Sequence, residues 1–263
     1  MALIKMNFLS KMLGMQTNVT ICLPTFSFAD IMNNNNDVYI PGMKYQVLWL
    51  LHGGSGDDSD YVNFSNIVRY SDQYKLAVVM PADYNMNYDD YDNGAKYQTY
   101  IAEELPNVLR SIFPFSDKRE DNFIGGLSMG AAGCEKIAIR YPENYAAALV
   151  MSGGTFYEEE NHTRLNTGMP MPIHRPEACN ENKIIAIKNI QERKKTPKFF
   201  TTCGDKDVVL KAHQESSKFL KEIGYDVFEE IVCGYGHEWD FWDITLRKAF
   251  EKWLPIQHRI IYP

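Results

Sequence analysis

The sequence lacks an excess of basic residues, a long apolar run and closely spaced cysteines. Its 27 Lys and Arg residues stand against 34 Asp and Glu residues, which gives a formal charge of −7 and argues against a nucleic-acid-binding protein. No apolar run approaches the roughly 18 residues that a membrane helix needs. The cysteines contain no CxxC or CxxH pair, so neither a disulfide framework nor a zinc site is expected. They are Cys22, Cys134, Cys179, Cys203 and Cys233.

The N-terminal segment also lacks the features of a secretory signal. Residues 1–14 alternate apolar and polar side chains and contain no continuous apolar core. Together with the dispersed cysteines, this pattern predicts a cytoplasmic protein, because thiols stay reduced there. We expect no membrane or nucleic-acid partner, no metal and no other cofactor.

What the sequence does contain is a series of short apolar runs, typical of strands buried on both faces of a sheet. Two further strands, Met1–Leu9 and Thr17–Leu23, are expected to form an antiparallel pair at one sheet edge. The apolar runs are Tyr45–Leu51, Leu76–Met80, Phe123–Gly125, Ala146–Met151, Phe199–Cys203 and Val227–Val232.

Helical patterns fall between these runs, which predicts an α/β fold with a mostly parallel sheet and helices on both faces. Residues 28–42 are expected to form a surface loop. Residues 153–195 are polar, with one short helix expected at Ile184–Glu192. We therefore predict a single domain, 1–263, with a cap-like insertion at about 153–196. The expected helices are Tyr61–Tyr70, Tyr97–Ile112, Met129–Arg140, Leu210–Ile223 and Asp240–Trp253.

A GxSxG motif, residues 126–130, follows directly after one predicted strand and precedes a helix. In this context the motif indicates a nucleophile elbow, in which a sharp turn lifts the hydroxyl of Ser128 clear of the sheet. The turn also directs the Met129 N–H toward a bound acyl oxygen at the positive end of the helix. The pentapeptide alone is a weak signal, because it also arises by chance, so its placement between strand and helix carries the interpretation.

An acid and a base are expected after later strands, in the chain order Ser, Asp or Glu, His. His237 lies in a glycine-rich loop after Val227–Val232, and two carboxylates compete after Phe199–Cys203. Asp207 is favoured over Asp205, because Gly204 can turn the chain so that Asp207 faces the histidine. Four other histidines are expected to be ordinary surface residues: His213, which lies on a helix, and His162, His174 and His258. His52 belongs to the glycine-rich loop after Leu51.

The second backbone donor of an oxyanion hole is expected after an early central strand. The sequence His52-Gly53-Gly54-Ser55-Gly56 follows Tyr45–Leu51, and Gly54 N–H would pair with Met129 N–H. A phosphate-binding loop is the weaker interpretation, because neither GxGxxG nor GK[ST] is present.

The residues as a whole resemble the esterase D group of α/β-hydrolases, and most closely its bacterial tributyrin esterases. S-formylglutathione hydrolases and feruloyl esterases are more distant relatives. The resemblance implies a serine carboxylesterase with Ser128, Asp207 and His237 as its triad, while residues 153–195 follow no family pattern. The motifs that carry it are LWLLHGGSGDDSDY (48–61), TYIAEELPNVL (99–109), FIGGLSMGAAGCEKIAIRYPENYAAALVMSGG (123–154), CGDKDVV (203–209) and GYGHEWDFW (234–242).

The leading hypothesis is hydrolysis of short-chain acyl esters, acetyl or butyryl, through an acyl-enzyme on Ser128. An acyltransferase, or an S-formylglutathione or feruloyl-type esterase, could use the same residues, and a binding protein on an inactive hydrolase fold is a further alternative. Ser55 and Trp239 are candidate substrate contacts, and Trp239 could equally pack in the core. A small-molecule ester is the expected partner, and a homo-oligomer is a further prediction.

Overall fold

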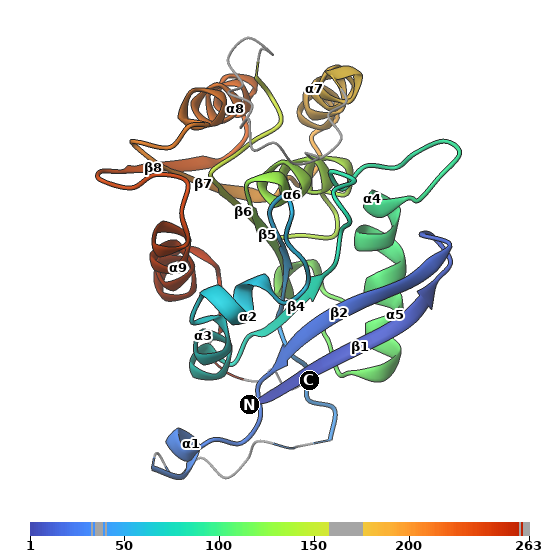
Figure 1. The fold of residues 1–263 in the computed structure, drawn as a ribbon, viewed down its shortest axis with the longest axis vertical. Coiled ribbons are helices and arrows are strands. Elements are labelled where there is room, and N and C mark those ends of the chain that lie inside the picture. Colours follow the sequence, from blue (N-terminus) through green and yellow to red (C-terminus); the bar gives the residue numbers. More distant parts are fainter. Residues whose placement is uncertain (33, 35–38, 40, 158–175, 258, 260–263) are drawn as a thin grey trace.

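The fold is built on one sheet of eight strands in the order β1-β2-β4-β3-β5-β6-β7-β8 (Figure 1). The computed structural model describes residues 1–32, 34, 39, 41–157, 176–257 and 259. The strands are β1 (Ala2–Ser10), β2 (Met15–Leu23), β3 (Val47–Leu51), β4 (Ala77–Pro81), β5 (Asn122–Leu127), β6 (Ala147–Met151), β7 (Lys198–Gly204) and β8 (Val227–Val232).

The direction of the strands confirms the predicted fold class. β1 pairs with β2, and β2 with β4, in antiparallel fashion, whereas the pairs from β4 through β3 to β8 are parallel. Parallel neighbours place all their carboxyl ends at one edge of the sheet, where open sheets of this kind bind their ligands. The loops after β3, β5, β7 and β8 therefore meet at one edge.

Side chains of the central strands pack alternately into two cores, one on each face. On β3, Trp49 packs into the core beneath α5, α6 and α8, whereas Leu48 and Leu50 pack into the core beneath α2, α3 and α9. This alternation explains the continuous apolar run, because both faces of the strand are buried. The helices are α1 (Phe28–Met32), α2 (Asp60–Phe64), α3 (Ile67–Tyr74), α4 (Tyr97–Thr99), α5 (Leu105–Ile112), α6 (Met129–Arg140), α7 (Pro176–Gln191), α8 (Leu210–Ile223) and α9 (Trp239–Lys248).

The prediction of one helix over 61–70 is wrong, because the structure has two. The chain leaves the helical conformation at Ser65, which is extended, and α3 begins only at Ile67. The Asp243 carboxylate of α9 accepts hydrogen bonds from the backbone N–H and side-chain amide of Asn66, at 2.7 and 2.9 Å. The hydrogen bonds to α9, which lies far along the chain, therefore stabilise the break between α2 and α3.

The prediction of a loop over 28–42 is also wrong for its first residues, which form α1. The Asp30 carboxylate holds this short helix by accepting hydrogen bonds from Ser27 N–H at 2.9 Å and from Lys75 at 2.8 Å. The predicted short helix near 184–192 is part of the longer α7. Residues 158–175 of the predicted cap-like insertion lie outside the described residues, and the insertion stays a prediction.

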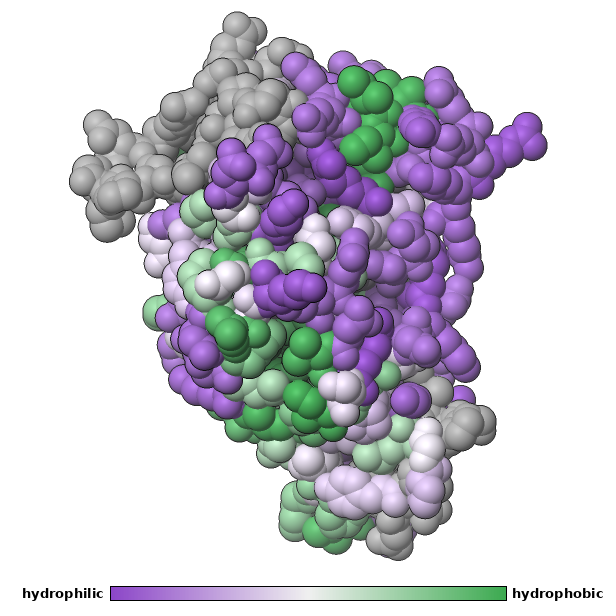
Figure 2. Space-filling model, turned by 90° about the vertical axis from the view of Figure 1, so that its right-hand side faces the viewer, coloured by the Kyte–Doolittle hydropathy of each residue, from purple (hydrophilic) through white to green (hydrophobic). Residues whose placement is uncertain are grey.

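The helix predicted over 97–112 is present, with a π-helical turn, Tyr100–Glu104, between α4 and α5. Figure 2 faces the side of the molecule that carries α5 and the edge strand β1, and it shows hydrophobic areas among hydrophilic ones. On β1, Leu3 and Leu9 are 46% and 68% exposed. Across the described ranges, no helix is both long and apolar enough to cross a membrane.

Candidate active site

Ser128 occupies a strained turn between β5 and α6. Its backbone has φ 54° and ψ −118°, a conformation that side-chain-bearing residues rarely adopt. The neighbouring glycines are required by close approaches: a Cβ on Gly126 would lie 2.2 Å from the Gly130 carbonyl oxygen, and one on Gly130 would lie 2.2 Å from the Leu51 carbonyl oxygen. The spacing of the GxSxG motif is therefore a steric demand of the turn.

The structure brings Ser128, His237 and Asp207 into one hydrogen-bonded row. His237 Nε2 lies 3.0 Å from Ser128 Oγ, and His237 Nδ1 lies 3.0 Å from both carboxylate oxygens of Asp207. Because a carboxylate can only accept, the Nδ1 atom carries the hydrogen of the neutral ring. The Nε2 lone pair then faces the serine hydroxyl, where it can take up its proton.

Asp207 is buried, yet its hydrogen-bond partners favour its charged form. Burial raises the pKa of this carboxyl, but the hydrogen bond and charge interaction with His237 and the hydrogen bonds from Val209 N–H and Ser152 outweigh burial, so its pKa lies below the usual value. Asp205 instead lies in solvent, with its carboxylate accepting the Gly234 N–H at 2.7 Å. Of the two competing acids, Asp207 is the one placed against the histidine.

Two residues beside this row were not singled out from the sequence. Trp242 Nε1–H donates to Ser152 Oγ at 3.0 Å, and the indole meets the His237 ring edge-on, with centroids 5.0 Å apart. Ser152 in turn bonds the Asp207 side chain. Both residues belong to motifs of the family resemblance, SGG and HEWDFW, but only the folded chain shows that they support the histidine and the acid.

The glycine-rich loop after β3 lies directly against the nucleophile turn. A Cβ on Gly53 would lie 3.4 Å from Ser128 Cβ and 2.6 Å from the Leu127 side chain. Gly54 follows in the same loop, and Met129 begins α6. The structure therefore brings the segments of both expected oxyanion donors to the serine.

Of the two candidate substrate contacts, Ser55 lies in this loop and Trp239 begins α9. Ser55 is exposed at a positive φ of 62°, and its N–H donates to Asn85 Oδ1 at 2.7 Å. Trp239 belongs to a cluster of rings, with centroid distances of 5.4 Å to Tyr61, 5.3 Å to Phe64 and 5.2 Å to Trp242. Through Trp242 this aromatic cluster is continuous with His237.

The prediction that His213 is a surface residue is wrong. It is fully buried on α8, and its Nδ1 lies 2.7 Å from the Gly153 carbonyl oxygen. Burial lowers the pKa of this imidazole, which favours its neutral form. His162, His174 and His258 lie outside the described residues.

A fully buried carboxyl, that of Glu135 on α6, contacts the chain two residues after Gly153. Its Oε2 accepts Thr155 N–H at 2.5 Å and Ser216 Oγ–H at 2.7 Å. Burial raises the pKa of Glu135 to about 7, although the bonds from Ser216 and Thr155 oppose the shift. In the unfolded chain the ordinary value, about 4.5, applies. Between these two pH values the Glu135 carboxyl therefore holds its proton in the folded protein and has released it in the unfolded chain.

This difference predicts that the contribution of Glu135 to stability falls with rising pH. That contribution to the free energy of unfolding should decrease from about pH 4.5 to about pH 7, because the unfolded state releases the proton first. Glu135→Gln should remove this contribution from the profile, since the amide keeps an acceptor oxygen and does not titrate. Denaturant unfolding from pH 4 to 8 checks the prediction. Equal slopes in the wild type and the variant would contradict it.

Comparison with known proteins places these features in context. Residues 29–252 match the family model Esterase, described as "Putative esterase". The chain is 30% identical over 266 residues to an acetyl esterase of Caldicellulosiruptor saccharolyticus, a match covering 95% of this chain and 97% of that protein.

Two solved structures from Staphylococcus aureus are similar to the whole fold. An S-formylglutathione hydrolase has a TM-score of 0.78 at 28% identity, covering 96% of this chain and 98% of that one. The fluorophosphonate-binding serine hydrolase F has a TM-score of 0.79, with the same identity and coverage.

Proposed function

The chain belongs to the esterase family of α/β-hydrolases and is a carboxylic ester hydrolase, and from this premise we propose that it hydrolyses short-chain acyl esters through an acyl-enzyme on Ser128. The observation that carries the proposal is the hydrogen-bonded row from Asp207 through His237 to Ser128. A serine hydroxyl is a weak nucleophile, and an adjacent base oriented by a third group activates it.

In the proposed mechanism, His237 Nε2 takes the proton of Ser128 as Oγ bonds to the ester carbonyl carbon. The carbonyl oxygen becomes an oxyanion, which Gly54 N–H and Met129 N–H stabilise. The histidine then gives its proton to the departing alkoxy group, and the alcohol leaves an acyl-serine behind. Water, deprotonated by the same histidine, attacks the acyl-serine, and the histidine returns that proton to Ser128 Oγ as the carboxylic acid leaves.

Asp207 keeps the histidine in the tautomer that this sequence of steps needs. The carboxylate accepts the Nδ1 hydrogen and stabilises the imidazolium that forms when the serine proton moves. Hydrogen bonds from Val209 N–H, at 3.0 Å, and from Ser152 hold the carboxylate charged and in place.

The similarity to an acetyl esterase over 95% of the chain supports a small acyl group. We therefore expect kcat/KM for p-nitrophenyl acetate and butyrate to exceed that for the octanoate by about tenfold or more, since even one methylene that the pocket does not accommodate costs about 1–3 kcal/mol. The measurement is the acyl-length series, run beside a feruloyl ester. A preference for the octanoate or for the feruloyl ester would contradict the proposed substrate class.

S-formylglutathione hydrolysis is a second candidate, favoured by the 28% identical structure of such an enzyme. The same assay with S-formylglutathione distinguishes the two, because kcat/KM above that for p-nitrophenyl acetate would favour the thioester.

Methanol added to the acetate assay tests for acyl transfer. Methyl acetate formed faster than acetate would indicate an acyltransferase.

The proposed partner of the enzyme is a small-molecule ester, and the wide cysteine spacing fits a reducing compartment such as the cytoplasm. The proposed chemistry uses side chains and backbone N–H groups alone, so it needs no cofactor. A homo-oligomer stays a prediction.

A further inference from the structure

The glycine-rich loop after β3, residues 52–56, is held by a second loop, residues 83–89, through three hydrogen bonds. Asp83 N–H donates to His52 Nε2 at 2.8 Å, and Tyr88 Oη–H donates to the His52 carbonyl oxygen at 3.1 Å. The third is the bond from Ser55 N–H to Asn85 Oδ1. Gly54 lies between the two residues of its loop that are bonded in this way.

The 83–89 loop has an unusual backbone that must be stabilised by its surroundings. Asn85, Asn87 and Tyr88 all have positive φ, between 51° and 61°. The buried Asp83 carboxylate accepts Met86 N–H at 2.6 Å and Tyr88 N–H at 2.9 Å. Because such conformations are costly for residues other than glycine, they persist only where neighbouring contacts determine them.

A single buried ammonium ties this loop to α6. Lys136 Nζ donates to the Asn87 carbonyl oxygen at 2.6 Å and to Asp89 Oδ1 at 2.7 Å. The side chains of Lys136 and Asp89 are each only 2% exposed. Lys136 lies seven residues, about two turns, after Met129 on the same helix. The loop that holds Gly54 is therefore attached to the helix that carries the other expected donor.

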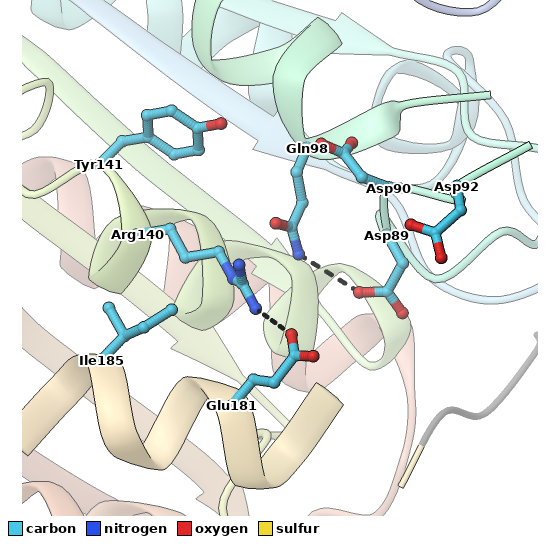
Figure 3. A pocket seen from close by; sticks show the side chains of 8 residues that line it. All are labelled: Asp89, Asp90, Asp92, Gln98, Arg140, Tyr141, Glu181 and Ile185. Atoms are coloured by element: carbon cyan, nitrogen blue, oxygen red, sulfur yellow. Dashed lines mark hydrogen bonds and ion pairs between the residues drawn. The ribbon is translucent and has the colours of Figure 1, made fainter. Parts of the chain in front are cut away.

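Asp89 also forms part of a cleft of about 470 Å³ at the far end of α6 (Figure 3). There Gln98 Nε2–H donates to Asp89 Oδ1 at 3.3 Å, and Arg140 pairs with Glu181 at 3.0 Å. Ser128 lies at the opposite end of this helix. Lys136 thus sits between the cleft and the nucleophile turn, and it contacts neither Ser128 nor His237 through any hydrogen bond in the described part of the chain.

We propose that Lys136 is a positioning residue, which fixes the distance between the two oxyanion donors by tying the 83–89 loop to α6. This inference rests on the proposed function. Donors on separate segments must be held to within about 0.5 Å of their productive places. The chain of contacts runs from Lys136 to Asn87, through the adjoining Tyr88 to His52, and so to Gly54.

The test compares Lys136→Met with the wild type, using the full chain. We expect kcat per labelled serine to fall by about 10- to 100-fold, with KM within about twofold. Residues that orient the groups acting directly on a ligand typically have effects of this size. A trifluoromethyl ketone provides the second readout. Ser128 Oγ adds to its carbonyl carbon, the serine proton goes to His237, and the resulting hemiketal oxyanion needs the same donors. In Lys136→Met the Ki of this inhibitor should rise by the same factor by which kcat/KM falls.

Two further variants separate positioning from stability. The double variant Lys136→Met with Asp89→Leu removes both buried charges and leaves neither unpaired, so it can be tested if the single variant fails to fold. It should lower kcat in the same way. Lys75→Met is the matched control, because it breaks a similar pair, with Asp30 at 2.8 Å, at the opposite edge of the sheet. It should lower stability and leave kcat per labelled serine and Ki unchanged.

Mass spectrometry measures the fraction of each protein that a fluorophosphonate labels at Ser128. Each rate is divided by this fraction, which gives kcat per labelled serine. A wild type that is not labelled would contradict the proposed function, and the positioning role with it. A labelled wild type together with Lys136 variants whose kcat and Ki stay within twofold would overturn the positioning role alone. An unchanged Ki with a reduced kcat would also overturn it.

Discussion

Replacing Ser128 with alanine should abolish ester hydrolysis while leaving the protein folded. We expect kcat to fall by at least about 10⁴-fold, because without Oγ no acyl-enzyme can form and only binding and backbone donors remain. The Ser128 backbone N–H bond to the Met151 carbonyl oxygen, at 2.9 Å, does not involve the side chain and remains. The measurement is p-nitrophenyl acetate turnover at saturating substrate.

Thermal unfolding of the same variant is its control. Alanine at a φ of 54° is about as strained as serine, so the melting temperature should stay within a few degrees of the wild type. A folded Ser128→Ala protein that keeps more than a few per cent of the wild-type activity would contradict the assignment of Ser128. If Ser128→Ala unfolds, Ser128→Gly takes its place as the test: glycine tolerates the positive φ, so this variant should stay folded and still lose the activity with the hydroxyl.

The sequence was most informative where a run of neighbouring residues carries the pattern. The run over β3 predicts a strand buried on both faces, and the two cores require that pattern. The motif around Ser128 predicts a sharp turn, and the contacts of Gly126 and Gly130 leave room only for glycine. In both places a few consecutive residues show the pattern, although distant segments such as Leu51 help to require it.

Distant contacts decide the features that sequence reasoning missed. The break between α2 and α3 is held by Asp243, and α1 is held by Lys75. His213 lies on a helix with several polar residues, yet its ring meets the Gly153 carbonyl oxygen. Partners separated by tens of residues leave no periodicity for a pattern to detect. Ser152, Trp242 and Lys136 escaped notice for the same reason.

Replacing the two competing acids one at a time should give opposite results. Asp207→Asn should lower kcat by about 10⁴-fold, the effect of the equivalent change in serine proteases. The asparagine oxygen accepts one bond, but its NH₂ group can donate to Nδ1 and so favour the tautomer with hydrogen on Nε2. That tautomer cannot take the proton of Ser128. The measurement is kcat for p-nitrophenyl acetate, with circular dichroism to verify the fold.

Asp205→Asn is the matched control, since it makes the same chemical change two residues away. Its amide oxygen can still accept the Gly234 N–H, so the loop before His237 should keep its conformation. We expect kcat within about threefold of the wild type, because removing an exposed charge that contacts no reacting group has a small effect. A large loss in Asp205→Asn with little change in Asp207→Asn would reassign the acid to Asp205. The two 3.0 Å contacts between Asp207 and His237 Nδ1 predict the opposite order.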